Sequence, residues 1–145
     1  MKRRPFLAIV FLLLVGTLLA ACDQPGATPT PRPGAILLSY ARTGGIAGFQ
    51  DQLNVGLGGE YFLSRGGQAQ RLGTLSAERR GQLQAWAGRF APFTLTLEDN
   101  PGGPDNMTRR VVWTGTGRTA PSETAQRQIL DWASALLDEL NASTR

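Results

Sequence analysis

The sequence contains no histidine, and Cys22 is its only cysteine among 145 residues. Histidine is the commonest general base and the commonest zinc ligand in proteins, so its absence excludes serine–histidine and cysteine–histidine catalysis. A single cysteine forms no internal disulfide and leaves no His/Cys metal site. Catalysis by paired carboxylates is the enzymatic chemistry that the composition still permits.

Paired carboxylates must face one pocket, and the sequence offers two adjacent pairs. Glu98 and Asp99 belong to an alternating segment, where neighbouring side chains of a strand point to opposite faces. Asp138 and Glu139 lie on the polar side of an amphipathic segment, which is typical of a solvated helix face. Neither pair indicates an active site, so we expect no enzymatic activity and no cofactor.

Long apolar runs are also lacking, because the longest one, residues 6–20, falls short of the ~20 residues that a membrane-spanning helix needs. It follows the basic head MKRRP, and residues 1–21 therefore read as a signal peptide. The run ends in LAAC at residues 19–22, which resembles the lipobox of bacterial lipoproteins. This resemblance implies cleavage before Cys22 and lipidation of its sulfur. The alternative is an ordinary secretory peptide with an incidental cysteine.

The excess of basic residues comes largely from the first residues of the chain. There are 15 Lys and Arg against 11 Asp and Glu, and the loss of Lys2, Arg3 and Arg4 with the signal peptide leaves 12 against 11. A net charge of +1 argues against a nucleic-acid surface. We expect a protein that is anchored to the cell membrane by the lipid on Cys22 and faces outside the cytoplasm.

Proline marks the boundary of the folded part. Residues 22–34 comprise the cysteine and a segment with four prolines in twelve residues, DQPGATPTPRPG, which predicts an extended tether. Residues 35–141 have the composition and length of one folded domain, and residues 142–145 form a polar tail.

The first half of this domain predicts strands. Residues 35–41 are an apolar run, and Phe49, Leu53, Val55 and Leu57 alternate with polar residues, apart from Asp51 on the apolar face. The turn LGGE leads into a third strand, YFLSR, and GGQAQ at residues 66–70 is expected to be a loop.

The second half predicts two helices around a hairpin. Ser76 is expected to cap a helix that starts at AERR, with an apolar face of Leu83, Trp86, Ala87 and Phe90. PFTLTLED and TRRVVWTG read as two strands joined by a long turn. Pro121 and Ser122 open the last helix, whose buried stripe is expected to contain Ile129, Leu130, Ala133, Leu136, Leu137 and Leu140, with Trp132 at its margin. The order β-β-β-α-β-β-α predicts an α+β fold: an antiparallel sheet of four to five strands with two helices on one face.

Two glycine-rich segments resemble phosphate-binding loops. GGIAG at residues 44–48 joins two predicted strands, whereas a dinucleotide-binding turn leads into a helix, and no lysine follows it as in a P-loop. TGTGR at residues 114–118 does precede a helix, with Arg118 as a possible anion ligand. Its pattern is more typical of a flexible loop, and we expect no phosphate site.

The arrangement of these segments resembles the emfourin family, small bacterial inhibitors of protealysin and related thermolysin-like zinc metallopeptidases. The similarity covers about residues 36–140 and rests on GGIAG followed by FQDQL, and on the last helix with ILDWASALL. The chain differs from the family in its extra hairpin, LGGEYFLSR, and in its lipoprotein signal. The resemblance implies a membrane-anchored inhibitor of a secreted thermolysin-like metallopeptidase; the alternative is an envelope adaptor that binds another protein.

The glycine turn is the expected contact site for a protein partner. Its glycines allow positive φ and a close approach of the backbone to another surface, and Ile46 and Ala47 would be exposed at its tip. The alternative is that the glycines satisfy only turn geometry and Ile46 folds onto the core. Asp51 is the acid nearest to the turn, and a carboxylate is one group that could coordinate a partner's metal; the more usual role of such an acid is a charge on an edge strand. The expected partner-binding residues are Gly44, Gly45, Ile46, Ala47, Gly48, Phe49 and Asp51.

Overall fold

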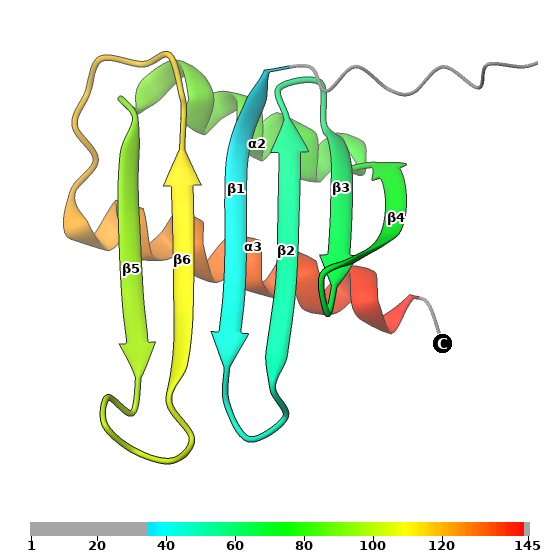
Figure 1. The fold of residues 1–145 in the computed structure, drawn as a ribbon. Coiled ribbons are helices and arrows are strands. Elements are labelled where there is room, and N and C mark those ends of the chain that lie inside the picture. The colour runs from blue at the N-terminus through cyan, green and yellow to red at the C-terminus, as the bar shows by residue number, and fades with distance from the viewer. Residues whose placement is uncertain (1–34, 144–145) are drawn as a thin grey trace, which may run out of the picture. The chain divides into compact units, whose positions relative to one another are not determined.

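The computed structural model of the protein describes residues 35–143 (Figure 1). The predicted signal peptide, Cys22 and the tether lie outside the described residues. No helix within residues 35–143 combines the length and apolarity needed to cross a membrane.

One antiparallel sheet of six strands forms the front layer of the domain in Figure 1. Its spatial order is β4-β3-β2-β1-β6-β5, so β2 and β1 lie in the interior of the sheet and β4 and β5 at its edges. The strands are β1 (Ile36–Gly44), β2 (Phe49–Gly56), β3 (Glu60–Arg65), β4 (Gln68–Thr74), β5 (Phe93–Asp99) and β6 (Met107–Trp113). The α+β class expected from the sequence is confirmed.

Both helices, α2 (Ala77–Arg89) and α3 (Glu123–Ala142), lie on the same face of the sheet (Figure 1). Each begins at the expected serine cap. The Ser76 hydroxyl accepts a hydrogen bond from the Arg79 backbone N–H at 3.3 Å, and the Ser122 hydroxyl accepts one from the Ala125 backbone N–H at 3.2 Å. These bonds satisfy amide groups that have no partner inside the helix, and they confirm both predicted helix starts.

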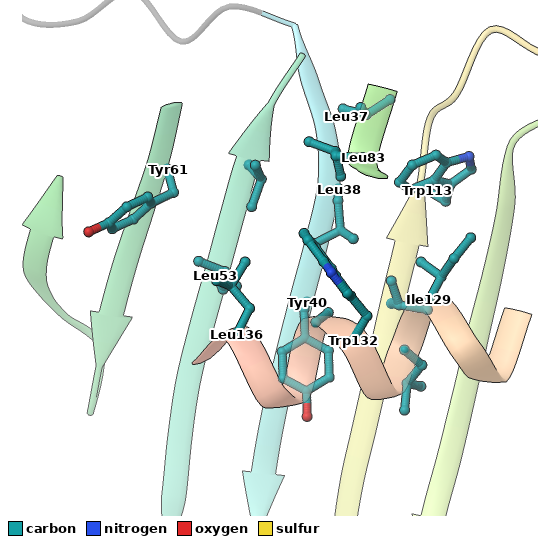
Figure 2. Packing of buried hydrophobic residues seen from close by; sticks show 14 of the residues in the cluster. Leu37, Leu38, Tyr40, Leu53, Tyr61, Leu83, Trp113, Ile129, Trp132 and Leu136 are labelled. Carbon is teal, nitrogen blue, oxygen red and sulfur yellow. The ribbon is translucent and has the colours of Figure 1, made fainter. Parts of the chain in front are cut away.

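The hydrophobic core fills the space between the sheet and the helices (Figure 2). Alternate side chains of the strands form the side of the core next to the sheet, and apolar side chains of α3 form much of the opposite side. Trp132, expected at the margin of the buried stripe of α3, is 7% exposed and packs edge-to-face on Trp86 at 5.6 Å. The buried apolar residues lie between residues 37 and 137, so a segment spanning residues 34–145 carries the whole described core.

The sheet has one strand more than the largest number expected, because residues 66–70 are not all loop. Gly66 (φ +59°) and Gly67 (φ +77°) form a two-residue hairpin turn, and Arg65 pairs with Gln68 across it. Two consecutive residues at positive φ are what a tight type I′ hairpin requires. The chain then continues as β4, whose only large aliphatic side chain, Leu72, is 59% exposed. Leu57, expected in the second strand, lies beyond Gly56 and is 50% exposed.

Candidate binding edge

Two loops lie side by side at the end of the sheet where β1 and β5 finish (Figure 1). One is the β1–β2 turn, residues 44–48, and the other is the β5–β6 loop, residues 100–106. The Gly45 backbone N–H donates to the Asn106 carbonyl at 2.9 Å, and the Ile46 backbone N–H donates to the Asp105 carboxylate at 2.8 Å. We call these two connected segments the binding edge.

The glycines of the β1–β2 turn have a clear conformational role. Gly44, Gly45 and Gly48 have φ values of +93°, +72° and +61°, a region that other residues seldom adopt. The Gly48 backbone N–H donates to the Gly45 carbonyl at 2.9 Å and closes the turn. At Gly44 an added Cβ would lie 2.5 Å from the Asn106 carbonyl oxygen, so this position also allows the two loops to approach each other.

Ile46 projects from the tip of this turn. Its side chain is 85% exposed, the highest value among the exposed large hydrophobic residues of the described chain, and Ala47 beside it is also exposed. Ile46 therefore does not fold onto the core, which was the alternative left open by the sequence. The Ile46 side chain is therefore accessible to a partner.

Phe49 and Asp51 lie at the base of the turn rather than at its tip. Phe49 is partly buried beneath the Arg42 guanidinium, which is 4.4 Å from the centre of its ring. Asp51 is 2% exposed, and β2 is an interior strand, so the edge-strand role considered for this acid is wrong. Asp51 accepts a hydrogen bond from Arg42 Nη2 at 2.7 Å, which occupies one of its carboxylate oxygens inside the domain.

Arg42 connects the base of the turn to the last helix. Its Nη1 donates to the Asp138 carboxylate at 3.0 Å, and its side chain is 11% exposed. Burial alone would lower the pKa of the Arg42 guanidinium, but the hydrogen bonds and charges of Asp51 and Asp138 outweigh burial and raise the pKa above its ordinary value. Arg42 is thus held as a permanent cation between the sheet and α3.

Three of the four adjacent acids that the sequence offers, Asp99, Asp138 and Glu139, form ion pairs within the domain. Asp99 receives two hydrogen bonds from Arg109, at 2.8 and 3.0 Å, and this pairing raises the pKa of the Arg109 guanidinium. Asp138 pairs with Arg42, and Glu139 pairs with Arg79 at 2.8 Å. Among residues 35–143 there is no group of three or more acidic, cysteine or histidine side chains placed to hold a metal ion.

Backbone N–H groups of the TGTGR segment donate hydrogen bonds within the domain. The N–H groups of Thr116 and Gly117 both donate to the Ala87 carbonyl at 3.0 Å, at the end of α2. A Cβ added at Gly117 would lie 2.1 Å from the Arg89 carbonyl carbon. The loop is therefore packed tightly against α2, and these amides do not face an anion.

A shallow depression of about 430 Å³ flanks the β1–β2 turn. Side chains that line it include Thr43, Gln50, Gln52 and Ser64, together with the backbone of the two glycine turns at this end of the sheet. It is open to solvent, in contrast to the enclosed clefts that usually bind small molecules. This surface adds to the accessible area around the turn.

Asp105 and Asn106 are the part of the binding edge that sequence reasoning missed. They follow the turn-forming residues NPGGP and were read as the rest of a long turn. An aspartate beside glycines and prolines is common in turns, so the local sequence holds no signal for its contact with Ile46, 59 residues earlier.

Comparisons of the chain with protein-family models, curated proteins and solved structures found no match.

Proposed function

We propose that the protein is a membrane-anchored lipoprotein whose domain inhibits a secreted thermolysin-like zinc metallopeptidase by inserting the binding edge into the peptidase cleft. The observation that carries the proposal is Ile46, 85% exposed at the tip of a turn that a second loop supports through two hydrogen bonds. Thermolysin-like peptidases favour apolar side chains of this kind in their substrate pocket. A supported turn also loses little conformational freedom on binding, which favours affinity.

The direction of β1 supports this arrangement. The described chain begins next to Ile36 at one end of β1, and the binding turn follows Gly44 at the other end. At about 3.3 Å per residue, nine residues of strand separate the two ends by roughly 30 Å. A tether attached before residue 35 would therefore join the domain at the end of β1 opposite the binding turn.

Inhibition is tested by titrating residues 34–145 against a thermolysin-like peptidase, ideally one secreted by the same cell. The informative variant is Ile46→Asp, which places a charge where an apolar pocket would receive the side chain. The matched control is Leu72→Asp, since Leu72 is also exposed but lies on β4 away from the binding edge. We expect stoichiometric inhibition by the parent domain and by the Leu72 variant, with loss of at least about 10-fold in affinity for Ile46→Asp.

Circular dichroism would confirm that both variants are folded. Inhibition that survives in a folded Ile46→Asp variant would move the contact site away from the turn. Absence of inhibition by the parent domain would reject the inhibitor function and favour the alternative, an envelope adaptor that uses the same exposed turn to bind a different protein.

A further inference from the structure

The peptide bond between Gly45 and Ile46 is hydrogen-bonded on both sides within the protein. Its carbonyl oxygen, on Gly45, accepts from the Gly48 backbone N–H at 2.9 Å. Its N–H group, on Ile46, donates to Asp105 Oδ1 at 2.8 Å. This is also the bond that a peptidase would attack if it accepted Ile46 as the residue following the cleavage site.

Peptidases of this kind hydrolyse a bond in an extended peptide, which pairs with the cleft much as an added β-strand does. The segment around this bond is not extended, because Gly44, Gly45 and Gly48 all have positive φ. To reach an extended form, the turn must release the Gly45 carbonyl from Gly48 and the Ile46 amide from Asp105. The neighbouring bond from the Gly45 N–H to the Asn106 carbonyl opposes the same movement.

We propose that Asp105 is a positioning residue that makes the binding edge resistant to cleavage, so that a peptidase binds the Ile46 turn without hydrolysing it. This inference rests on the proposed inhibitory function and adds the reason why the domain is an inhibitor rather than a substrate. Asp105 is exposed, and its carboxylate reaches the turn from the neighbouring loop, so its loss removes the restraint without disturbing the core.

The reaction that Asp105 suppresses is ordinary hydrolysis. Water supplied in the peptidase site adds to the Gly45 carbonyl carbon, the bond to the Ile46 nitrogen breaks, and that nitrogen takes up a proton. The products are a carboxylate on Gly45 and a new amino terminus on Ile46. In the parent domain, strands β1 and β2 also hold these two ends together through the pairing of Gly44 with Phe49.

The test compares Asp105→Ala with the parent domain during incubation with excess thermolysin-like peptidase. Intact-mass spectrometry and amino-terminal sequencing report cleavage between residues 45 and 46. We expect this bond to be cut about 10- to 100-fold faster in Asp105→Ala, the range for losing one hydrogen bond to a charged group. Hydrogen exchange of the Ile46 amide should accelerate in parallel, while the melting temperature stays close to that of the parent.

Two further variants separate a local restraint from a general effect of charge. Asp105→Asn keeps a side-chain oxygen that can accept from the Ile46 N–H, so it should remain largely resistant. Glu98→Ala removes an exposed acid from β5 in the same half of the sheet and should behave as the parent.

The two proposals fail in different ways. Equal cleavage rates at the 45–46 bond for Asp105→Ala and the parent would overturn the role of Asp105, even if both inhibit. Faster cleavage confined to Asp105→Ala supports that role, and initial-rate inhibition by the parent domain reports on the proposed function separately.

Discussion

Arg42 on β1 and Asp51 on β2 form an ion pair, with Arg42 Nη2 2.7 Å from Asp51 Oδ2 and side-chain exposures of 11% and 1%. The two residues face each other across the β1–β2 pair, Arg42 two residues before Gly44 and Asp51 three residues after Gly48. Because α3 contributes Asp138 to the same guanidinium, this pair ties the base of the binding turn to the last helix. Its removal should therefore affect both stability and the order of the turn.

Asp51→Asn should destabilise the domain by about 3 kcal/mol, because it removes the negative partner of a largely buried cation. Asp138→Asn is the matched control: Asp138 contacts the same guanidinium at 3.0 Å but is 60% exposed, and it should cost less than about 1 kcal/mol. Urea unfolding of residues 34–145 at neutral pH measures both free energies. Equal losses in the two variants would contradict the importance of burial in this network.

Tyr40 provides a prediction for alkaline pH. Burial raises the pKa of its hydroxyl above the ordinary value of 10.0, although nearby Ser134, Arg42 and Arg109 act in the opposite direction and Asp138 adds to the increase. Tyrosine is charged when deprotonated, so the unfolded chain releases this proton first. The corresponding stability is fully present below about pH 10 and is lost as the pH rises through the folded-state pKa.

Tyr40→Phe should remove this part of the alkaline sensitivity. At neutral pH the variant should differ from the parent by no more than about 1 kcal/mol, because the Tyr40 hydroxyl is buried without a hydrogen bond of good geometry to any described residue. Urea midpoints measured between pH 8 and pH 11 would show a smaller decline for Tyr40→Phe than for the parent. Parallel curves would mean that Tyr40 does not contribute to the alkaline loss.

Alanine substitutions at Gly44 and Gly48 distinguish the effect of the contact between the two loops from the effect of backbone strain in the turn. Both have positive φ, but a Cβ would lie 2.5 Å from the Asn106 carbonyl at Gly44 and would meet no atom within 4 Å at Gly48. Gly48→Ala should cost about 1–2 kcal/mol from backbone strain alone. Gly44→Ala should cost more, about 2–4 kcal/mol, because it also pushes the loops apart.

Thermal and urea unfolding of the two alanine variants measure this difference. The Ile46 amide should also exchange faster in Gly44→Ala than in Gly48→Ala, since separating the loops weakens its bond to Asp105. If Gly48→Ala were the more damaging change, the close approach of the two loops would not be the reason for glycine at position 44.

Features that depend on neighbouring residues were predicted well. The serine caps at Ser76 and Ser122 were recognised because a cap and the amide that it accepts from are three residues apart. The strand β4 was missed because Leu72 is the only large aliphatic residue in its sequence, so the segment shows no alternation of apolar and polar residues. The Gly66-Gly67 pair was the local sequence signal that indicated a hairpin leading into β4.

The sequence by itself determined the α+β class, both helix starts, the position of the glycine turn, and the absence of histidine and of any cysteine besides Cys22. These follow from residue types and from periodicities of two and 3.6 residues, which act over a few positions. The tertiary structure alone decided that Asp51 lies in an interior strand against Arg42, and that Asp105 holds the amide of Ile46. Such contacts depend on the order in which strands pair, and no short segment of the sequence encodes that order.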